Sequence, residues 1–180
     1  MKFRALEAHE IDVRVAQCKQ NGCSLLLYKD ARCDMNILDE TVGEENWQRE
    51  HYECKGNLFC KVGILIANGD SITRWVWKSD CGVESNTEAQ KGEASDSFKR
   101  ACFNWGIGRE LYTSPFIWID NKKCDLKDSG RKDRNGKPVY VTYDKFKVEK
   151  IVIENGKIIA LAIWNVTKNC RAFVWKHENN

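Results

Sequence analysis

Residues Asp80–Tyr112 read DCGVESNTEAQKGEASDSFKRACFNWGIGRELY, and this stretch decides most of the fold prediction. Ser85 and Glu88 stand three residues apart, as in a capping box, so they predict the start of a helix. The helix is expected to run to about Leu111. Its predicted apolar face consists of Ala94, Phe98, Ala101, Cys102 and Trp105.

The polar side of this predicted helix carries Lys91, Lys99 and Arg100, and Arg109 follows at its end. Basic side chains in a row can hold the phosphate backbone of any nucleic acid, because each contact releases counterions whatever the base sequence. A lysine–arginine pair on a polar helix face is, however, more often simply solvated. On the residues alone, a solvated pair is therefore favoured over a phosphate-binding pair.

Strands are expected on the N-terminal side of this helix. The segments 47–54, 57–67 and 72–83 are separated by Lys55-Gly56 and by Asn68-Gly69-Asp70, which are tight-turn residues at hairpin spacing. These segments predict a three-stranded antiparallel meander. Before them, Ala31–Val42 has apolar residues at helical spacing and ends at Gly43, which is typical of a helix with a glycine C-cap.

The outer parts of the chain complete the prediction. Arg4–Gln17 is expected to form a helix. Five further strands are expected at 116–119, 139–143, 147–154, 158–166 and 171–175, with a hairpin turn at Asn155-Gly156. The predicted fold class is α+β: an antiparallel β-meander followed by a long amphipathic helix packed on the curved sheet (a β-β-β-α core), with a C-terminal β-hairpin.

The composition is typical of a globular protein. The 180 residues are 42% hydrophobic and 31% charged, and this length suits one domain spanning 1–180. Met1–Glu10 lacks the apolar segment of a secretory signal, and the apolar runs are too short for a membrane span, so a cytoplasmic location is expected. Nine cysteines are scattered without a C-x-x-C pair, which favours free buried thiols over a zinc site.

The formal net charge is only +3, but the charge is unevenly distributed. The segment Lys122–Lys150 contains ten basic and five acidic side chains. Such a segment can attract phosphates, although on charge alone a solvated basic loop is the more common explanation.

Three strings of residues carry a family resemblance. The string KGEASDSFKRACFNWGIGRELY (91–112) follows DCGVESN (80–86), and LDETVGEENW (38–47) precedes both. In this order they resemble the Rad52 superfamily, and in particular the single-strand annealing proteins of phages and bacteria called the Sak type. The resemblance covers about residues 28–112, the annealing-protein core, and leaves 113–180 as a basic loop and β-hairpin extension.

The resemblance implies a non-enzymatic protein that forms homo-oligomeric rings. It would bind single-stranded DNA by its phosphates, leave the bases free, and anneal complementary strands in recombination and repair without ATP or another cofactor. It also implies a bacteriophage origin, with an exonuclease or a single-strand-binding protein as possible partners. The implied DNA-binding residues are Lys99 and Arg100, which match the family's basic pair, together with Lys91, Arg109, Lys55 and Lys61.

Two other functions stay open on the sequence. A protein that coats single strands without annealing them would have the same residues. A metal-dependent nuclease is the enzymatic alternative, suggested by the carboxylates Asp80, Glu84, Glu88, Glu93 and Asp96. Trp75 and Trp77 point to one face of the third predicted strand, where a core or subunit-interface role is expected more often than base stacking.

Overall fold

The computed structural model describes residues 1–68, 72–83 and 89–177. Contacts between residues divide the chain into two compact units. Unit 1 comprises Met1–Ala5 and Asp30–Arg109, and unit 2 comprises Leu6–Lys29 and Glu110–Asn180. The expectation that 1–180 forms a single domain stays a prediction.

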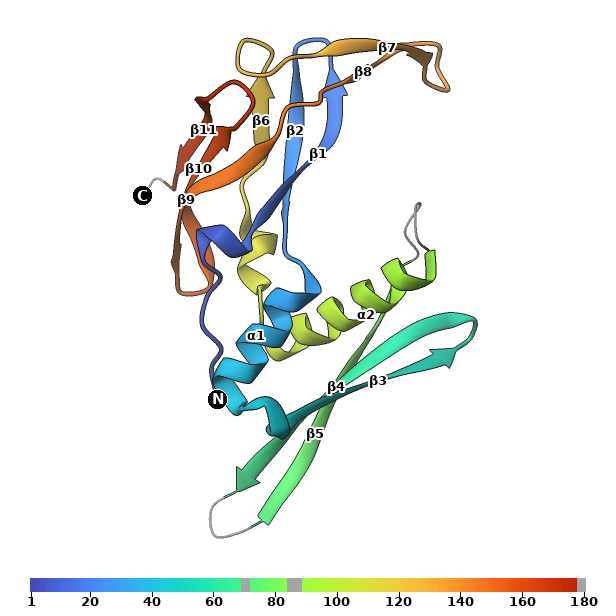
Figure 1. The fold of residues 1–180 in the computed structure, drawn as a ribbon, viewed down its shortest axis with the longest axis vertical. Helices are drawn as coiled ribbons and strands as arrows, with labels where there is room; N and C mark the ends of the chain where they lie inside the picture. Colours follow the sequence, from blue (N-terminus) through green and yellow to red (C-terminus); the bar gives the residue numbers. More distant parts are fainter. Residues whose placement is uncertain (69–71, 84–88, 178–180) are drawn as a thin grey trace. The chain divides into compact units, whose positions relative to one another are not determined.

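Unit 1 contains two helices and a three-stranded sheet (Figure 1). Its elements are α1 (Ala31–Val42), a short 3-10 helix (Glu44–Asn46), β3 (Trp47–Cys54), β4 (Asn57–Asn68), β5 (Ile72–Cys81) and α2 (Ala89–Trp105). The sheet order β3-β4-β5 is antiparallel throughout, which confirms the predicted meander. The Asp30 carboxylate accepts the Cys33 N–H at 2.9 Å and caps α1. Gly43, with a φ of 88°, ends α1 as predicted.

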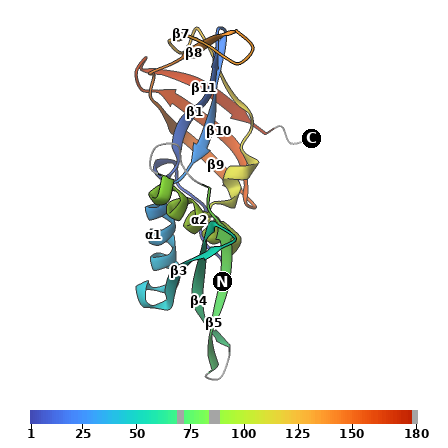
Figure 2. The same cartoon turned by 90° about the vertical axis from the view of Figure 1, so that its right-hand side faces the viewer.

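Unit 2 is built from strands taken from both ends of the chain. They are β1 (Asp12–Lys19), β2 (Gly22–Tyr28), β6 (Ile117–Asp120), β7 (Lys127–Lys132), β8 (Pro138–Val141), β9 (Phe146–Glu154), β10 (Lys157–Asn165) and β11 (Cys170–Lys176), with short 3-10 helices at Ala8–Glu10 and Arg109–Thr113. Six of these strands form one sheet in the order β11-β10-β9-β1-β2-β6. Figure 2 shows its strands β9, β10 and β11 side by side. Its two edge strands, β11 and β6, approach each other, so the sheet is nearly closed.

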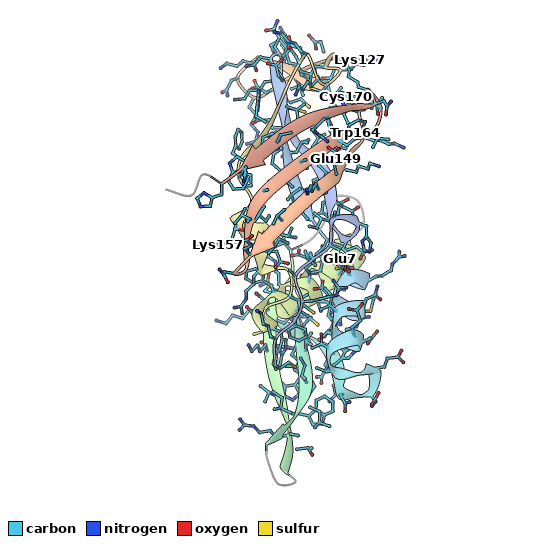
Figure 3. The ribbon with its side chains drawn as sticks, turned by 90° about the vertical axis from the view of Figure 1, so that its left-hand side faces the viewer. Glu7, Lys127, Glu149, Lys157, Trp164 and Cys170 are labelled. Atoms are coloured by element: carbon cyan, nitrogen blue, oxygen red, sulfur yellow. The ribbon has the colours of Figure 1, made fainter. Side chains whose placement is uncertain are left out.

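The C-terminal strands of unit 2 are tied together by an ion pair. The carboxylate of Glu149 on β9 accepts two hydrogen bonds of 2.6 Å from the guanidinium of Arg171 on β11 (Figure 3 labels Glu149). This bidentate contact lowers the pKa of Glu149 below its ordinary value. Both groups are at the surface, so solvent screens the pair and its contribution to stability is small.

The predicted fold class is wrong. The chain is mostly β, with 50% of its residues in strands and 23% in helices, and its largest element is the nearly closed six-stranded sheet. The prediction of a β-β-β-α core with a long helix and a C-terminal hairpin contains no such sheet. The reason is physical: β1 and β2 pair with strands from the other end of the chain, and pairing over such a distance has no local sequence signal.

The predicted helix Arg4–Gln17 is also wrong. Residues Ala8–Glu10 form a single 3-10 turn, and β1 begins at Asp12. In this segment Val13 and Val15 alternate with polar residues, and β1 pairs with β2 across the Asn21-Gly22 turn region. Strand pairing therefore outweighs the loose helical spacing of the apolar residues.

The cysteines are free thiols, and Cys23, Cys33, Cys60, Cys102 and Cys124 are buried. Burial raises the pKa of the Cys60 thiol from an ordinary value of 9.0 to about 11. The unfolded chain ionises this thiol at lower pH than the folded chain does. The free energy of unfolding is therefore unaffected by Cys60 below about pH 9 and falls as the pH rises toward the folded-state pKa.

We expect the free energy of unfolding of the Cys60→Ala variant to fall less than that of the wild type as the pH rises above about 9. One thiol with a raised pKa removes about 1.4 kcal/mol of stability per pH unit in that range. Urea unfolding of both proteins near pH 8 and near pH 10.5 measures the difference. An identical decline in the two proteins would contradict the shifted pKa.

In the described part of the chain, no helix combines the length and the apolar character that crossing a membrane requires.

Candidate nucleic-acid interface

Helix α2 lies against one face of the sheet β3-β4-β5. The face of β4 that carries Cys60, Val62 and Ile64 is fully buried, and α2 contacts both β4 and β5. On α2, Phe98 is fully buried in the same unit. The Trp105 indole N–H donates a hydrogen bond of 3.0 Å to the carbonyl of Val62. The last turn of the helix is thereby fastened to the sheet.

The other end of the helix approaches the sheet closely at Gly82. A Cβ atom on this residue would lie 2.2 Å from the carbonyl oxygen of Glu93, so only glycine fits. The Gly82 N–H donates to the carbonyl of Leu58 at 2.9 Å. The Leu58 N–H in turn donates to the Glu93 carboxylate at 3.0 Å. Helix α2 is therefore held to the sheet at two places, and its polar side has a fixed direction.

Two cations cover the C-terminal end of α2. The guanidinium of Arg109 donates to the carbonyls of Phe103 and Asn104, both at 2.8 Å, and lies 5.6 Å from the centre of the Phe103 ring. The ammonium of Lys78, on β5, donates to the same Asn104 carbonyl at 2.9 Å and lies 4.6 Å from the Trp105 ring. The last carbonyls of a helix lack intrahelical donors, and its C-terminus attracts positive charge. These contacts hold both cations in place.

Lys99 and Arg100 lie one turn before this end. Both are partly exposed, and the Arg100 Nε pairs with the Asp96 carboxylate at 2.7 Å. Asp96 also accepts the Val83 N–H at 3.1 Å, so it links the end of β5 to the helix. Arg100 thus has an acidic neighbour, which reduces its attraction for phosphate until the pair opens.

Two of these four cations lie on α2 itself, and the other two contact its C-terminal carbonyls. Lys99 and Arg100 lie four residues before Phe103 and Asn104, and side chains four residues apart are neighbours on a helix. Arg109 and Lys78 contact Phe103 and Asn104 directly. We call this group the α2 cationic surface, and it consists of Lys78, Lys99, Arg100 and Arg109.

The comparison with protein families covers this surface. Residues 4–128 match the model of the Rad52/22 family, described as double-strand break repair proteins. The match includes all of unit 1 from Arg4 onward, and it includes the whole of α2. The chain belongs to the Rad52/22 family. The family resemblance inferred from the sequence is confirmed.

One curated relative supports the same assignment. This Rad52/22 family member is 30% identical over 117 residues to a protein of Deinococcus radiodurans described as single-stranded DNA-binding protein DdrA. The alignment covers 63% of this chain and 53% of that protein, so the chain spans about half the length of the relative. No solved structure matches the chain significantly.

The other predicted DNA-binding residues of this Rad52/22 protein lie elsewhere. Lys61 is on the face of β4 opposite to α2, where it pairs with Glu50 at 3.1 Å and lies 5.0 Å from the Trp77 ring. Lys55 is exposed in the β3–β4 turn. Lys91 is in α2, but its side chain lies outside the described part of the chain, as does the predicted capping box of Ser85 and Glu88.

The surroundings of Lys55 are acidic. A pocket of about 310 Å³ beside the turn is lined by Glu53, Gly56, Asn57, Leu58 and Glu93. Its two carboxylates repel phosphate, so this pocket does not extend the cationic surface. Lys99 and Arg100 therefore lie on the helix whose C-terminal carbonyls Arg109 contacts, whereas Lys55 and Lys61 lie elsewhere.

The face of the sheet opposite α2 carries exposed aromatic side chains. Trp75 and Trp77 are each 38% exposed, with ring centres 5.9 Å apart, and Tyr52 stacks on Phe59 at 5.5 Å. Neither tryptophan is part of the core in unit 1. We call this aromatic group, together with Lys61, the outer face of the sheet.

The carboxylates that suggested a nuclease have structural partners. Asp80 accepts hydrogen bonds from Cys81 N–H at 2.8 Å and from the Asn104 amide at 3.3 Å. The carboxylates of Glu93 and Asp96 accept hydrogen bonds from the backbone N–H groups of Leu58 and Val83, respectively. Glu84 and Glu88 lie outside the described residues.

Sequence reasoning missed Lys78. The signal was present, because Trp75 and Trp77 share one face of the strand and Lys78 must then point to the face that the helix covers. The pairing of Lys78 with Val62 in the neighbouring strand confirms this direction. The contact with the end of α2 could not be foreseen without knowing where the helix ends relative to β5.

Proposed function

We propose that this protein binds single-stranded DNA along the α2 cationic surface. The observation that carries the proposal is that Lys99 and Arg100 lie on the C-terminal half of α2, while Lys78 and Arg109 contact the last carbonyls of the same helix. Membership of a double-strand break repair family and the similarity to a single-stranded DNA-binding protein support it. Phosphate contacts of this kind are independent of base sequence, and they weaken as salt rises.

We further propose that the protein anneals complementary strands without ATP. Two single strands repel each other through their phosphates, and cations that neutralise the phosphates reduce this repulsion. A site that grips only the backbone leaves the bases able to pair. Base pairing then supplies the free energy, so no nucleotide hydrolysis is required.

An annealing assay distinguishes this function from the coating of single strands. Two complementary labelled oligonucleotides are mixed at low protein concentration, with and without ATP. We expect duplex to form several times faster with protein than without it, and equally fast in both nucleotide conditions. Tight single-strand binding with no acceleration would instead identify a coating protein.

We also propose that the working form is a homo-oligomer. The outer face of the sheet exposes several large aromatic side chains in one group, and such groups on a protein surface commonly mark interaction sites. Light scattering during gel filtration measures the particle mass. A mass equal to the chain mass of 20.8 kDa would contradict the proposal.

Removing the negative charge next to Arg100 is expected to strengthen DNA binding. In Asp96→Asn the amide oxygen can still accept the Val83 N–H, but the ion pair with Arg100 is lost. One unit charge at about 4 Å in water is worth about 1 kcal/mol, so we expect the affinity for oligo-dT to rise about two- to fivefold. Fluorescence anisotropy at low salt measures the change. Unchanged or weaker binding by a folded variant would show that Arg100 does not contact the DNA.

A further inference from the structure

The hairpin β7–β8 of unit 2 forms a two-stranded sheet of its own. Lys127 pairs with Val141 and Lys132 pairs with Pro138, with an irregular register between them. Strand β8 contacts β1, so the base of the hairpin is attached to the six-stranded sheet (Figure 1). The hairpin lies almost entirely beyond residue 128, where the match to the Rad52/22 family ends.

Positive charge is concentrated in this hairpin. Residues 127–141 contain five basic and two acidic side chains, a net charge of +3 that equals the net charge of the whole chain. All five basic side chains are exposed, and they are Lys127, Arg131, Lys132, Arg134 and Lys137. The remainder of the sequence therefore carries no net charge, and the hairpin is the local source of the excess.

The two acidic side chains of the hairpin are occupied with its backbone. The Asp128 carboxylate accepts the Gly130 N–H at 2.8 Å. The Asp133 carboxylate accepts the N–H groups of Asn135 and Lys137 at 2.8 and 2.9 Å. Among the described residues, none of the five hairpin cations forms an ion pair with a carboxylate. The carboxylates shape the turns and leave the cations facing solvent.

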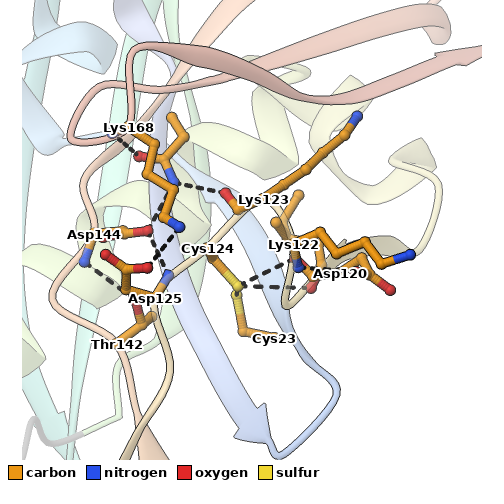
Figure 4. A network of polar contacts seen from close by, with 11 residues as sticks. Cys23, Asp120, Lys122, Lys123, Cys124, Asp125, Thr142, Asp144 and Lys168 are labelled. Atoms are coloured by element: carbon orange, nitrogen blue, oxygen red, sulfur yellow. Dashed lines mark hydrogen bonds and ion pairs between the residues drawn. The ribbon is translucent and has the colours of Figure 1, made fainter.

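The base of the hairpin is held by a polar network (Figure 4). The Asn165 amide donates to the Asp144 carboxylate at 2.8 Å, and the same carboxylate accepts the Asp125 N–H at 2.9 Å. Asp125 in turn pairs with Lys168. Figure 4 shows the side chains of Lys122 and Lys123 extending away from this network. Both are exposed and add two more cations beside the hairpin.

The chemistry of this surface fits double-stranded DNA better than a single strand. Proteins that hold single strands combine cations with exposed aromatic rings on which bases stack. The hairpin has one aromatic residue, Tyr140, which is partly buried, and the exposed ring of Tyr143 just after β8 is a single ring rather than a row on which successive bases stack. A duplex keeps its bases stacked internally and presents only phosphates and grooves, and its major groove admits a two-stranded β-ribbon.

We propose that the β7–β8 hairpin, with Lys122 and Lys123, binds the phosphate backbone of double-stranded DNA. This site is separate from the α2 cationic surface in sequence and belongs to the other unit. The inference deepens the proposed function, on which it rests for its biological meaning, because duplex is the product of annealing. Duplex binding itself can be measured independently.

The test compares two triple variants of the full chain that lose the same charge. The hairpin variant is Arg131→Ala, Lys132→Ala and Arg134→Ala. The control variant is Lys150→Ala, Lys157→Ala and Lys176→Ala, which removes three exposed cations of unit 2 on β9, β10 and β11. The probes are a labelled blunt duplex of 30 base pairs and a labelled oligo-dT of 30 nucleotides, titrated at several salt concentrations.

We expect the hairpin variant to lose at least tenfold in affinity for the duplex and to remain within about twofold for oligo-dT. The salt slope for duplex binding should fall by about 2 to 3, since each phosphate contact contributes about 0.9. The control variant should keep most of its duplex affinity.

Four results would overturn the inference, three of them for duplex binding alone. The wild type could fail to bind the duplex, the hairpin variant could bind it normally, or both triple variants could lose the same affinity. Equal loss of duplex and oligo-dT binding in the hairpin variant would also overturn it, because the hairpin would then belong to the single-strand site. A failure of the proposed function would be recognised by a different result, because the wild type would then not bind oligo-dT.

Discussion

Replacing Lys99 and Arg100 together with alanine is expected to lower the affinity for single-stranded DNA at least about tenfold. The two side chains form the middle of the α2 cationic surface, and a charge-assisted contact contributes about 1.5 kcal/mol or more. The ion pair between Arg100 and Asp96 reduces the share of Arg100, so Lys99→Ala alone should account for the larger part. The loss should be similar for all base sequences.

The salt dependence identifies the cause of this loss. Each phosphate contact to a single strand contributes about 0.7 to the salt slope, so the double variant should show a slope reduced by about 1.4. The matched control is Lys2→Ala with Arg32→Ala, which removes two exposed cations of the same unit. If the double variant binds oligo-dT as tightly as the wild type, the α2 surface is not the binding site.

Truncating Phe98 is expected to have the largest effect on stability. The side chain is fully buried, its ring stacks on Trp47 with centres 6.1 Å apart, and the guanidinium of Arg49 lies 4.7 Å from it. Phenylalanine-to-alanine changes at such positions cost about 3–5 kcal/mol, because they lose apolar burial and leave a cavity. We expect Phe98→Ala to lower the free energy of unfolding by about this amount.

Urea unfolding measures this effect, and Phe103→Ala is the matched control on the same helix. Phe103 is partly exposed and supports Arg109, so its truncation should cost clearly less stability while disturbing the cationic surface. A loss below about 1 kcal/mol in Phe98→Ala would show that α2 does not pack on the sheet as described. The two helix variants therefore separate packing from DNA binding.

Local patterns in the sequence were sufficient where the structure depends on neighbouring residues. The turn at Lys55-Gly56 and the helix Ala31–Val42 were predicted correctly, because tight turns and amphipathic helices have short-range signals. The same reasoning failed for β1, because its loose apolar spacing was taken for a helix although the segment pairs with β2 in a hairpin. It also missed β7, whose residues Lys127–Lys132 are polar and form a strand only by pairing with β8.

The residues of the candidate site likewise divide into those with a local sequence signal and those whose role depends on contacts between distant segments. Lys99 and Arg100 could be named from the sequence, since they are consecutive on the polar side of a recognisable helix. Lys78 and Asn104 could not, because their contact depends on the register of β5 against β4 and on where α2 ends. The concentration of charge near the hairpin was visible in the sequence, but the occupation of Asp128 and Asp133 by backbone N–H groups required the structure.

The order of strands in the six-stranded sheet has a consequence for synthesis on the ribosome. Strand β1 pairs with β9, with Asp12 opposite Lys147, so this sheet cannot be completed until nearly the whole polypeptide has emerged. The segment Asp30–Arg109, by contrast, emerges as one continuous stretch and can fold earlier. Contacts between distant residues also slow folding. The N-terminal β1–β2 hairpin therefore has to wait for β6 and β9, both of which are translated after that segment.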